Sequence, residues 1–120
     1  MNILIVDDEE PVRDSFRQIL GVFGHNTDTA AGVEEAVKLL DKSTYDFIFI
    51  DYNMPGKSGL ELLKYIKEKS PSSKTAMLTG YPLMKEEIAK FAGVDEYLQK
   101  PFDAAKIIRL VNKYHKDQQA

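Results

Sequence analysis

Residues 3–8 read Ile-Leu-Ile-Val-Asp-Asp, four apolar residues followed at once by two carboxylates. A second run of the same form, Phe-Ile-Phe-Ile-Asp, occupies residues 47–51. Neither run alternates between apolar and polar residues, as a strand with one face in water would. Continuous apolar strands are typical of parallel sheets that helices cover on both faces. We therefore predict a buried parallel sheet whose strands end in acidic residues.

Weaker strand candidates and amphipathic segments alternate along the rest of the chain. The candidate strands lie at 26–30, 76–78 and 94–98. The segments between strands carry apolar residues three and four positions apart, as one face of a helix requires. These stripes contain Val12, Phe16, Ile19, Leu20 and Phe23; Val33, Ala36, Val37 and Leu40; Leu60, Leu63 and Ile66; Met84, Ile88 and Phe91; and Ala104, Ile107, Ile108 and Val111.

Turn and capping residues agree with this division. Pro11 suits a first helical turn, Gly24 a helix end, and Asp103 the N-cap of the last helix. Five strand–helix units predict an α/β fold, a doubly wound (βα)5 parallel sheet with the flavodoxin-like strand order 2-1-3-4-5. The length predicts a single domain, 1–120, with no output domain.

The composition is typical of a soluble globular protein. The 120 residues are 43% hydrophobic and 29% charged, with a net charge of −3 and no cysteine. The absence of cysteine removes disulfides, thiolate zinc sites and cysteine nucleophiles, and the acidic balance disfavours nucleic acid as a partner. No apolar run approaches the ~20 residues that span a bilayer, and no signal peptide is evident. We expect a cytoplasmic protein that binds neither nucleic acid nor membrane.

Three carboxylates fall where the predicted strands end. Asp7 and Asp8 follow the first strand, and Asp51 closes the third. The predicted strand order makes these strands neighbours, and ligands of open parallel sheets bind at the carboxyl ends of strands. Carboxylates crowded together repel one another unless a cation lies among them, and Mg²⁺ prefers oxygen ligands. The pattern therefore predicts a magnesium site.

The ends of the other two strands supply complementary groups. Thr79 offers a hydroxyl after the fourth strand, and Lys100 an ammonium after the fifth. A metal and a lysine neutralise charge on oxygen, a hydroxyl donates a hydrogen bond, and one carboxylate is left as the nucleophile. These residues predict a site for a phosphoryl group. Asp51 is the candidate nucleophile because it stands alone on the central strand.

Four short motifs follow one another along the chain: Ile-Leu-Ile-Val-Asp-Asp-Glu at 3–9, Asp-Tyr-Asn-Met-Pro-Gly at 51–56, Leu-Thr-Gly at 78–80 and Tyr-Leu-Gln-Lys-Pro-Phe at 97–102. In this order and near this spacing, they resemble those of response-regulator receiver domains of two-component signalling. The resemblance extends over essentially the whole chain and is to the stand-alone type found in chemotaxis and sporulation phosphorelays.

The resemblance implies roles for the acidic residues. Asp51 would accept a phosphoryl group from a sensor histidine kinase, a histidine phosphotransfer protein or a small phosphodonor. Asp8 and Asp51 would bind Mg²⁺ directly, Asp7 through water, and Asn53 through its backbone carbonyl. The chain would then catalyse only its own phosphorylation and dephosphorylation, so we do not expect an enzyme with substrate turnover.

The resemblance also implies a switch. Thr79 would move to the phosphoryl group, Lys100 would pair with it, and Tyr97 would turn inward as Thr79 moves. The change would alter the face of the fourth helix, fifth strand and fifth helix. The Lys100–Pro101 bond resembles one that is cis in the family.

Partner proteins follow from the same resemblance. We expect a kinase-docking face at the first helix and a downstream protein target, in a monomer or a weak phosphorylation-dependent dimer. Both a relay intermediate and a terminal effector remain open. The docking face would contain Arg13, Ser15, Phe16 and Ile19.

Three features depart from the family pattern. The interval from Thr79 to Lys100 is one residue shorter than in typical members, and Pro82 follows soon after Thr79, so the geometry of the fourth helix is left open. Gly80 replaces the commoner alanine. Tyr81 lies two positions past Thr79, and we hypothesise that its bulk lengthens the phosphoryl lifetime.

Two other functions compete with the receiver. A haloacid-dehalogenase-like phosphatase also uses an Asp after a parallel strand, but needs a second carboxylate where this chain has Asn53. A nucleotide-binding module would need a glycine-rich phosphate loop, which is missing. His25 and His115 lack metal-ligand spacing, and we expect surface or packing roles for them.

Overall fold

The computed structural model describes the chain except residues 53, 55–58, 81–92, 102 and 120. Five parallel strands form one sheet in the order β2-β1-β3-β4-β5, which confirms the predicted fold class and strand order. The strands are β1 (Asn2–Val6), β2 (Asn26–Ala30), β3 (Phe47–Asp51), β4 (Lys74–Thr79) and β5 (Glu96–Gln99).

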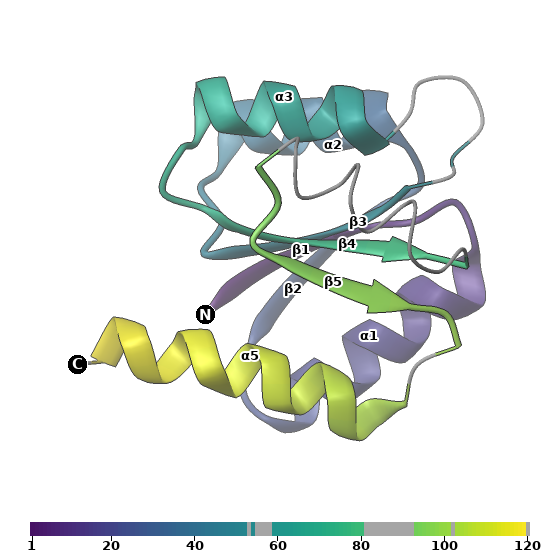
Figure 1. The fold of residues 1–120 in the computed structure, drawn as a ribbon, viewed down its shortest axis with the longest axis vertical. Coiled ribbons are helices and arrows are strands. Elements are labelled where there is room, and N and C mark those ends of the chain that lie inside the picture. The colour runs from purple at the N-terminus through teal and green to yellow at the C-terminus, as the bar shows by residue number, and fades with distance from the viewer. Residues whose placement is uncertain (53, 55–58, 81–92, 102, 120) are drawn as a thin grey trace.

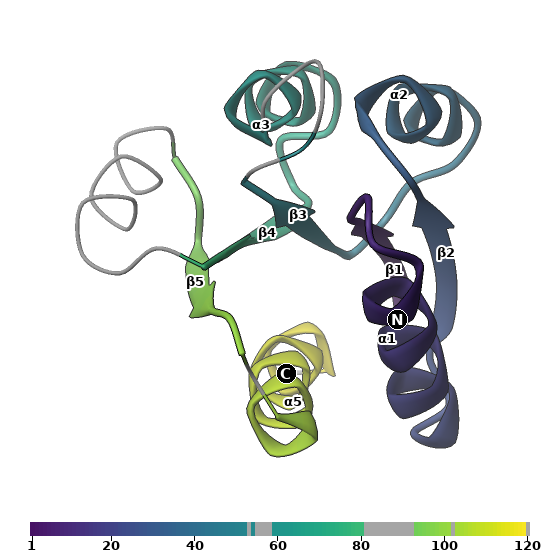
Figure 2. The ribbon, with the colours of Figure 1, turned by 90° about the vertical axis from the view of Figure 1, so that its right-hand side faces the viewer.

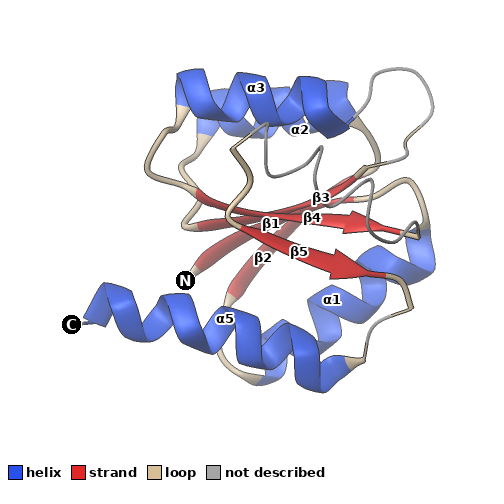
Figure 3. Cartoon of the chain, viewed as in Figure 1, coloured by secondary structure: helices blue, strands red, loops and turns tan. Residues whose placement is uncertain are grey.

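Helices cover both faces of this sheet. Helices α2 and α3 lie over one face, and α1 and α5 over the other (Figures 1 and 2). Figure 3 shows the same layers by secondary structure. The helix predicted around Ile88 lies outside the described residues. The four described helices are α1 (Glu10–Val22), α2 (Val33–Lys42), α3 (Gly59–Lys69) and α5 (Ala104–Gln119).

The continuous apolar strands are explained by this two-sided cover. Successive side chains of a strand point to opposite faces. Leu4 and Val6 accordingly belong to the core cluster beneath α2 and α3, while Ile3 and Ile5 belong to the cluster beneath α1 and α5. Each face of the sheet therefore has its own apolar layer.

Helix ends follow the predicted capping residues. α1 carries Pro11 in its first turn, and Gly24, just past its end, has a φ of 82°, a conformation that favours glycine. At α5, Asp103 Oδ1 accepts a hydrogen bond from the Lys106 backbone N–H at 2.9 Å.

None of the helices in the described part of the chain combines the length and apolarity that a membrane crossing requires.

The structure corrects one prediction about α1. Phe16, expected on the docking face, is fully buried beneath α1 and α5. Its ring lies against that of Phe49, with the ring centroids 4.8 Å apart. Ser15 is exposed and Ile19 partly exposed, so both remain available to a partner.

We expect Phe16→Ala to reduce the free energy of unfolding by about 3–5 kcal/mol, the usual loss for a buried phenylalanine. The neighbouring exposed substitution Ser15→Ala should change it by less than about 0.5 kcal/mol. Urea unfolding followed by circular dichroism measures both. Equal stability of the two variants would contradict the burial of Phe16.

His25 and His115 pack against each other near the amino ends of the strands. Their ring centroids are 5.3 Å apart and the rings are nearly perpendicular, at 89°. The Met1 ammonium donates a hydrogen bond to His25 Nδ1 at 3.0 Å. The packing role expected for the histidines is confirmed. Burial, the positive charge of the Met1 ammonium and the electrostatic interaction with His115 lower the pKa of His25 below its usual 6.5.

This lowered pKa predicts a loss of stability in acid. The unfolded chain protonates His25 near pH 6.5, whereas the folded protein resists that proton, so stability is retained above this pH and falls below it. From about pH 7.5 to 5.5, we expect the wild type to lose more free energy of unfolding than His25→Gln. Urea unfolding at each pH measures the difference. Parallel pH curves for the two proteins would contradict it.

Candidate functional site

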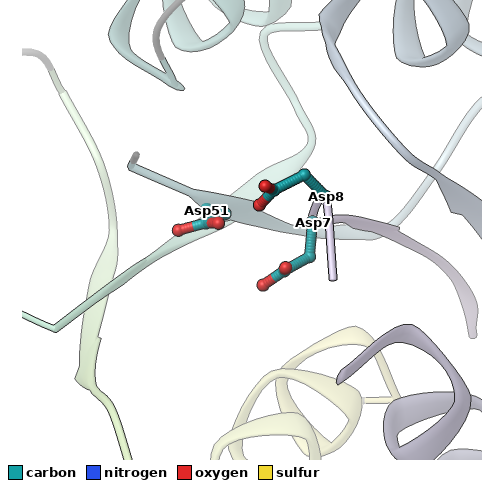
Figure 4. A group of neighbouring side chains, drawn as sticks. All are labelled: Asp7, Asp8 and Asp51. Carbon is teal, nitrogen blue, oxygen red and sulfur yellow. The ribbon is translucent and has the colours of Figure 1, made fainter. Parts of the chain in front are cut away.

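Three carboxylates meet at the carboxyl ends of β1 and β3. These strands are neighbours in the sheet, so Asp7 and Asp8, just after β1, lie beside Asp51, the last residue of β3. One oxygen from each carboxylate can be chosen so that all three lie within 4.8 Å of one another. Figure 4 shows the three side chains grouped at this edge. Asp7 and Asp51 are buried and Asp8 is exposed, so the cluster opens to solvent at Asp8.

The Lys100 ammonium lies among these acidic groups. Its Nζ is 3.0 Å from Asp7 Oδ2 and 3.5 Å from Asp51 Oδ2. A longer contact of 3.9 Å reaches Glu9 Oε2. One cation therefore offsets the charges of two buried carboxylates, which would otherwise repel each other without water to screen them.

The protonation of Lys100 is maintained by these contacts. Burial alone would lower the pKa of Lys100. The hydrogen bond to Asp7 and the charges of Asp7, Asp51 and Glu9 outweigh that effect and raise the pKa above its ordinary value. Lys100 is therefore positively charged at every physiological pH.

Hydrogen bonds hold Asp7 in position. Its Oδ1 accepts the Glu9 backbone N–H at 2.9 Å, and its backbone carbonyl accepts a bond from Arg13 Nη1 at 2.8 Å. The Asp7 N–H donates to the Ala30 carbonyl at 3.1 Å, which continues the pairing of β1 with β2. The turn from β1 to α1 thus fixes the carboxylate that faces Lys100.

Thr79 and Tyr97 lie on the same face of the sheet. Thr79, the buried last residue of β4, is two positions beyond Met77, and Met77 is the cross-strand partner of Tyr97 in β5. Alternate residues share a face, so the three side chains project to the same side. The Lys100 N–H donates to the Thr79 carbonyl at 2.6 Å, which joins the ends of β4 and β5. Thr79 and Lys100 are therefore adjacent along the same edge as Asp51.

A glycine that sequence analysis did not single out makes the site possible. Gly59 begins α3, and a Cβ added there would lie 2.5 Å from the Asp51 carbonyl oxygen and 3.1 Å from Tyr52 Cα. Any larger residue would have to displace the backbone that carries the Asp51 side chain. Nothing in the local sequence distinguishes this glycine from one at an ordinary turn.

An apolar groove lies between α1 and α5 beside the acidic cluster. Val12, Ile19 and Ile107 contribute apolar surface, and the groove extends to Ser15 and Lys100. Ser15 and Ile19, two residues of the predicted docking face, therefore line the same groove as Lys100, whose ammonium contacts Asp51. Arg13 lies instead in a second, more polar hollow between α1 and α2.

The predicted site is largely assembled. The structure brings together Asp7, Asp8, Asp51 and Lys100, with Thr79 on the adjoining strand. The Lys100–Pro101 peptide bond is cis, as the resemblance implied. Asn53, predicted to supply a backbone oxygen, lies outside the described residues, as do Tyr81 and Pro82.

Comparison with known proteins identifies the family. Residues 3–112 match the model of the response regulator receiver domain. The chain therefore belongs to the response-regulator receiver domain family, which acts in two-component signalling. Nothing in the comparisons supports the phosphatase alternative.

The chain is similar to regulators of different length. The chemotaxis protein CheY-3 of Vibrio cholerae is 37% identical over 117 residues, covering 94% of this chain and 90% of that protein. The response regulator protein PilR of Pseudomonas aeruginosa is 37% identical over 109 residues, covering 90% of this chain but 24% of PilR. The match to PilR therefore involves only about a quarter of the longer protein.

A solved structure agrees closely with the fold. The response regulator protein TrrA from Thermotoga maritima, crystallised with Mg²⁺ and BeF, has a TM-score of 0.84 and 35% identity to this chain. The match covers 94% of this chain and 97% of TrrA.

Gly59→Ala should displace Asp51 and slow its chemistry. Because misplacing a reacting group by about 1 Å can reduce a rate up to 100-fold, we expect at least a tenfold slower phosphorylation by acetyl phosphate. Intact-mass spectrometry over time measures the rate. The matched control is Gly21→Ala, since a Cβ there meets nothing within 4 Å. Phosphorylation of Gly59→Ala at the control's rate would contradict the role assigned to Gly59.

Proposed function

We propose that Asp51 is the phosphoryl acceptor of this receiver domain. The observation that carries the proposal is the contact of Lys100 Nζ with Asp51 Oδ2, at 3.5 Å, inside a cluster of acidic groups. Asp51 is buried at the end of a central strand, and Lys100 contacts it less closely than it contacts Asp7, at 3.5 Å against 3.0 Å. Asp7 also accepts the Glu9 N–H, so we assign the acceptor role to Asp51.

The proposed reaction is a direct transfer to the carboxylate. One Asp51 oxygen attacks phosphorus, a P–O bond forms, and the P–N bond to the donor's phosphohistidine breaks. The leaving ring nitrogen takes up a proton from water, and Asp51 becomes an acyl phosphate. With a small acyl phosphate as donor, the broken bond is P–O and the carboxylate leaves. Water attack on phosphorus later releases inorganic phosphate and restores Asp51.

The chain's own residues stabilise charge during this transfer. Lys100 would neutralise an equatorial phosphoryl oxygen, and the Thr79 hydroxyl would donate a hydrogen bond to another. To do so, Lys100, whose ammonium carries three N–H donors, would turn at least one of them to the phosphoryl group. That turn would affect the connection between the ends of β4 and β5, where the Lys100 N–H donates to the Thr79 carbonyl. Tyr97, on the same face as Thr79, would respond to the change.

The acidic cluster fits a magnesium ion. Its donors are carboxylate oxygens, the ligands that a hard divalent cation prefers, and its exposed member, Asp8, leaves an entry route. Asp7, Asp8 and Asp51 would hold Mg²⁺, with Asn53 adding a backbone oxygen. When bound, the ion supplies further positive charge to neutralise phosphoryl oxygens. The Mg²⁺ in the TrrA complex supports this assignment.

Partner proteins would meet the chain beside this site. A histidine kinase or a phosphotransfer protein must bring its phosphohistidine to Asp51, and the groove between α1 and α5 adjoins Lys100. Ser15 and Ile19 offer the contact surface, whereas Phe16 is buried and does not. The phosphorylated chain would act on a downstream protein, as a relay intermediate or a terminal effector, without nucleic acid or membrane contact. We further propose a cytoplasmic location, where phosphodonors reach it, and a monomer or weak phosphorylation-dependent dimer.

The proposed function does not include the turnover of an external substrate. The chain would catalyse its own phosphorylation and dephosphorylation, at one phosphoryl group per molecule. Release of many equivalents of p-nitrophenol from p-nitrophenyl phosphate would contradict this part of the proposal.

We expect acetyl phosphate with Mg²⁺ to add one phosphoryl mass to the wild type and none to Asp51→Asn, because an amide cannot form the acyl phosphate. Intact-mass spectrometry measures the addition. The matched control is Asp14→Asn, which changes a half-buried aspartate of α1 that pairs with Arg17 at 3.7 Å and should leave the addition unchanged.

Two results would contradict the assignment. Uptake of phosphate by Asp51→Asn as fast as by the wild type would place the acceptor elsewhere. An unchanged rate after removal of Mg²⁺ by a chelator would exclude the metal role of the acidic cluster.

A further inference from the structure

The two histidines of the chain come together at the end of the sheet away from Asp51. His25 directly precedes β2, and His115 lies in the C-terminal part of α5. Figure 1 shows that the N-terminus and the end of α5 lie on the side opposite the strand arrowheads. The acidic cluster lies on the arrowhead side, where β1 and β3 end. Since the chain has 2 histidines and no cysteine, all its imidazole ligands are gathered in one place.

The ring arrangement suits two imidazoles that share one metal ion. With metal–nitrogen bonds of about 2.0–2.1 Å and tetrahedral angles, two bound imidazole rings have centroids about 5 Å apart. The observed separation is 5.3 Å, with the rings at 89°. The Met1 amino nitrogen is 3.0 Å from His25 Nδ1, close to the roughly 3.3 Å between nitrogens on one tetrahedral ion.

The backbone on both sides of the pair is held in place. The His25 N–H donates to the Leu20 carbonyl at 3.1 Å, and the Asn26 N–H to the Met1 carbonyl at 3.0 Å. On α5, the neighbouring Tyr114 ring packs against Phe47 with centroids 5.1 Å apart. Metal binding would therefore need little ordering of the chain, which favours affinity.

From this geometry we propose that His25 and His115 together bind a divalent transition-metal ion of the zinc, nickel or copper class, with the Met1 amino nitrogen as a third ligand. Imidazole nitrogen suits these ions, whereas Mg²⁺ and Ca²⁺ prefer oxygen. The two ends of the sheet would thus select different metals. An ion at the histidines would connect the C-terminal part of α5 to the starts of β1 and β2.

Protonation controls the proposed site. Metal binding requires neutral imidazoles and a neutral amine, so protons compete at His25, His115 and Met1. The pKa of His25 is lowered by burial, by the Met1 ammonium and by His115, which keeps this ligand neutral at pH 7. We expect affinity to fall in acid, where protons compete with the metal ion for the ligand nitrogens.

The test is titration of the full chain, starting at Met1 and carrying no affinity tag, with ZnCl₂ in excess Mg²⁺. Excess Mg²⁺ occupies the acidic cluster, so calorimetry should report one equivalent of zinc at the histidines. We expect binding at least tenfold weaker in His115→Gln and in His25→Gln. The matched control Asp14→Asn changes a carboxylate that pairs with Arg17, outside the acidic cluster and the histidines, and should bind zinc as the wild type does. Circular dichroism verifies that each variant is folded.

A second measurement uses the wild type alone. Paramagnetic Co²⁺, added in excess Mg²⁺, should broaden amide NMR signals around His25 and His115 and spare those around Asp51. Unchanged zinc affinity in both histidine variants, broadening centred on the acidic cluster, or no zinc binding in excess Mg²⁺ would each overturn the proposal. Because phosphorylation of Asp51 is not part of either measurement, the receiver function stands or falls independently.

Discussion

The ammonium of Lys100 lies between two buried carboxylates, 3.0 Å from Asp7 and 3.5 Å from Asp51, and the functional edge of the sheet depends on this placement. Carboxylates packed against an apolar core are destabilising unless a positive charge compensates them. Lys100 supplies that charge from the end of β5, at the far side of β4 from Asp51. A group that replaces Asp7 or Asp51 as the partner of Lys100 therefore affects the ends of β1, β3 and β5 together.

Sheet topology brings these charges together. Placing β1 beside β3 puts Asp7 and Asp8 next to Asp51, although β2 and two helices separate the strands in sequence. The helix layers leave this end of the sheet open while burying both of its faces. Gly59 then lets α3 approach the Asp51 carbonyl closely enough to fix the strand end. A local change of charge at Asp51 is thus coupled to a rigid frame, as a phosphorylation switch requires.

The sequence was sufficient to predict the strands, their order and the acidic cluster. Continuous apolar runs identified the buried strands, and the position of each aspartate directly after a run indicated which edge it would occupy. These signals are local, or follow from one topological rule. The capping role of Asp103 was likewise readable because its hydrogen bond reaches only to Lys106.

Other features depend on contacts that no local pattern encodes. Phe16 belongs both to the apolar stripe of α1 and to the docking face that the resemblance implied, and its packing against Phe49 decides between the two. The close approach of Gly59 to Asp51, and the contact of His25 with His115, arise from packing between distant segments. Spacing rules for metal ligands do not apply to such a pair, because they describe ligands that are near in sequence.

The central claim is that Asp51 accepts the phosphoryl group and that Lys100 contacts that group. A crystal structure of the chain with Mg²⁺ and beryllofluoride, a mimic of the phosphoryl group, tests it most directly. We predict beryllium bonded to an Asp51 carboxylate oxygen and Lys100 Nζ within hydrogen-bond distance of a fluoride. Beryllium on another aspartate, or a Lys100 that contacts no fluoride, would contradict the claim.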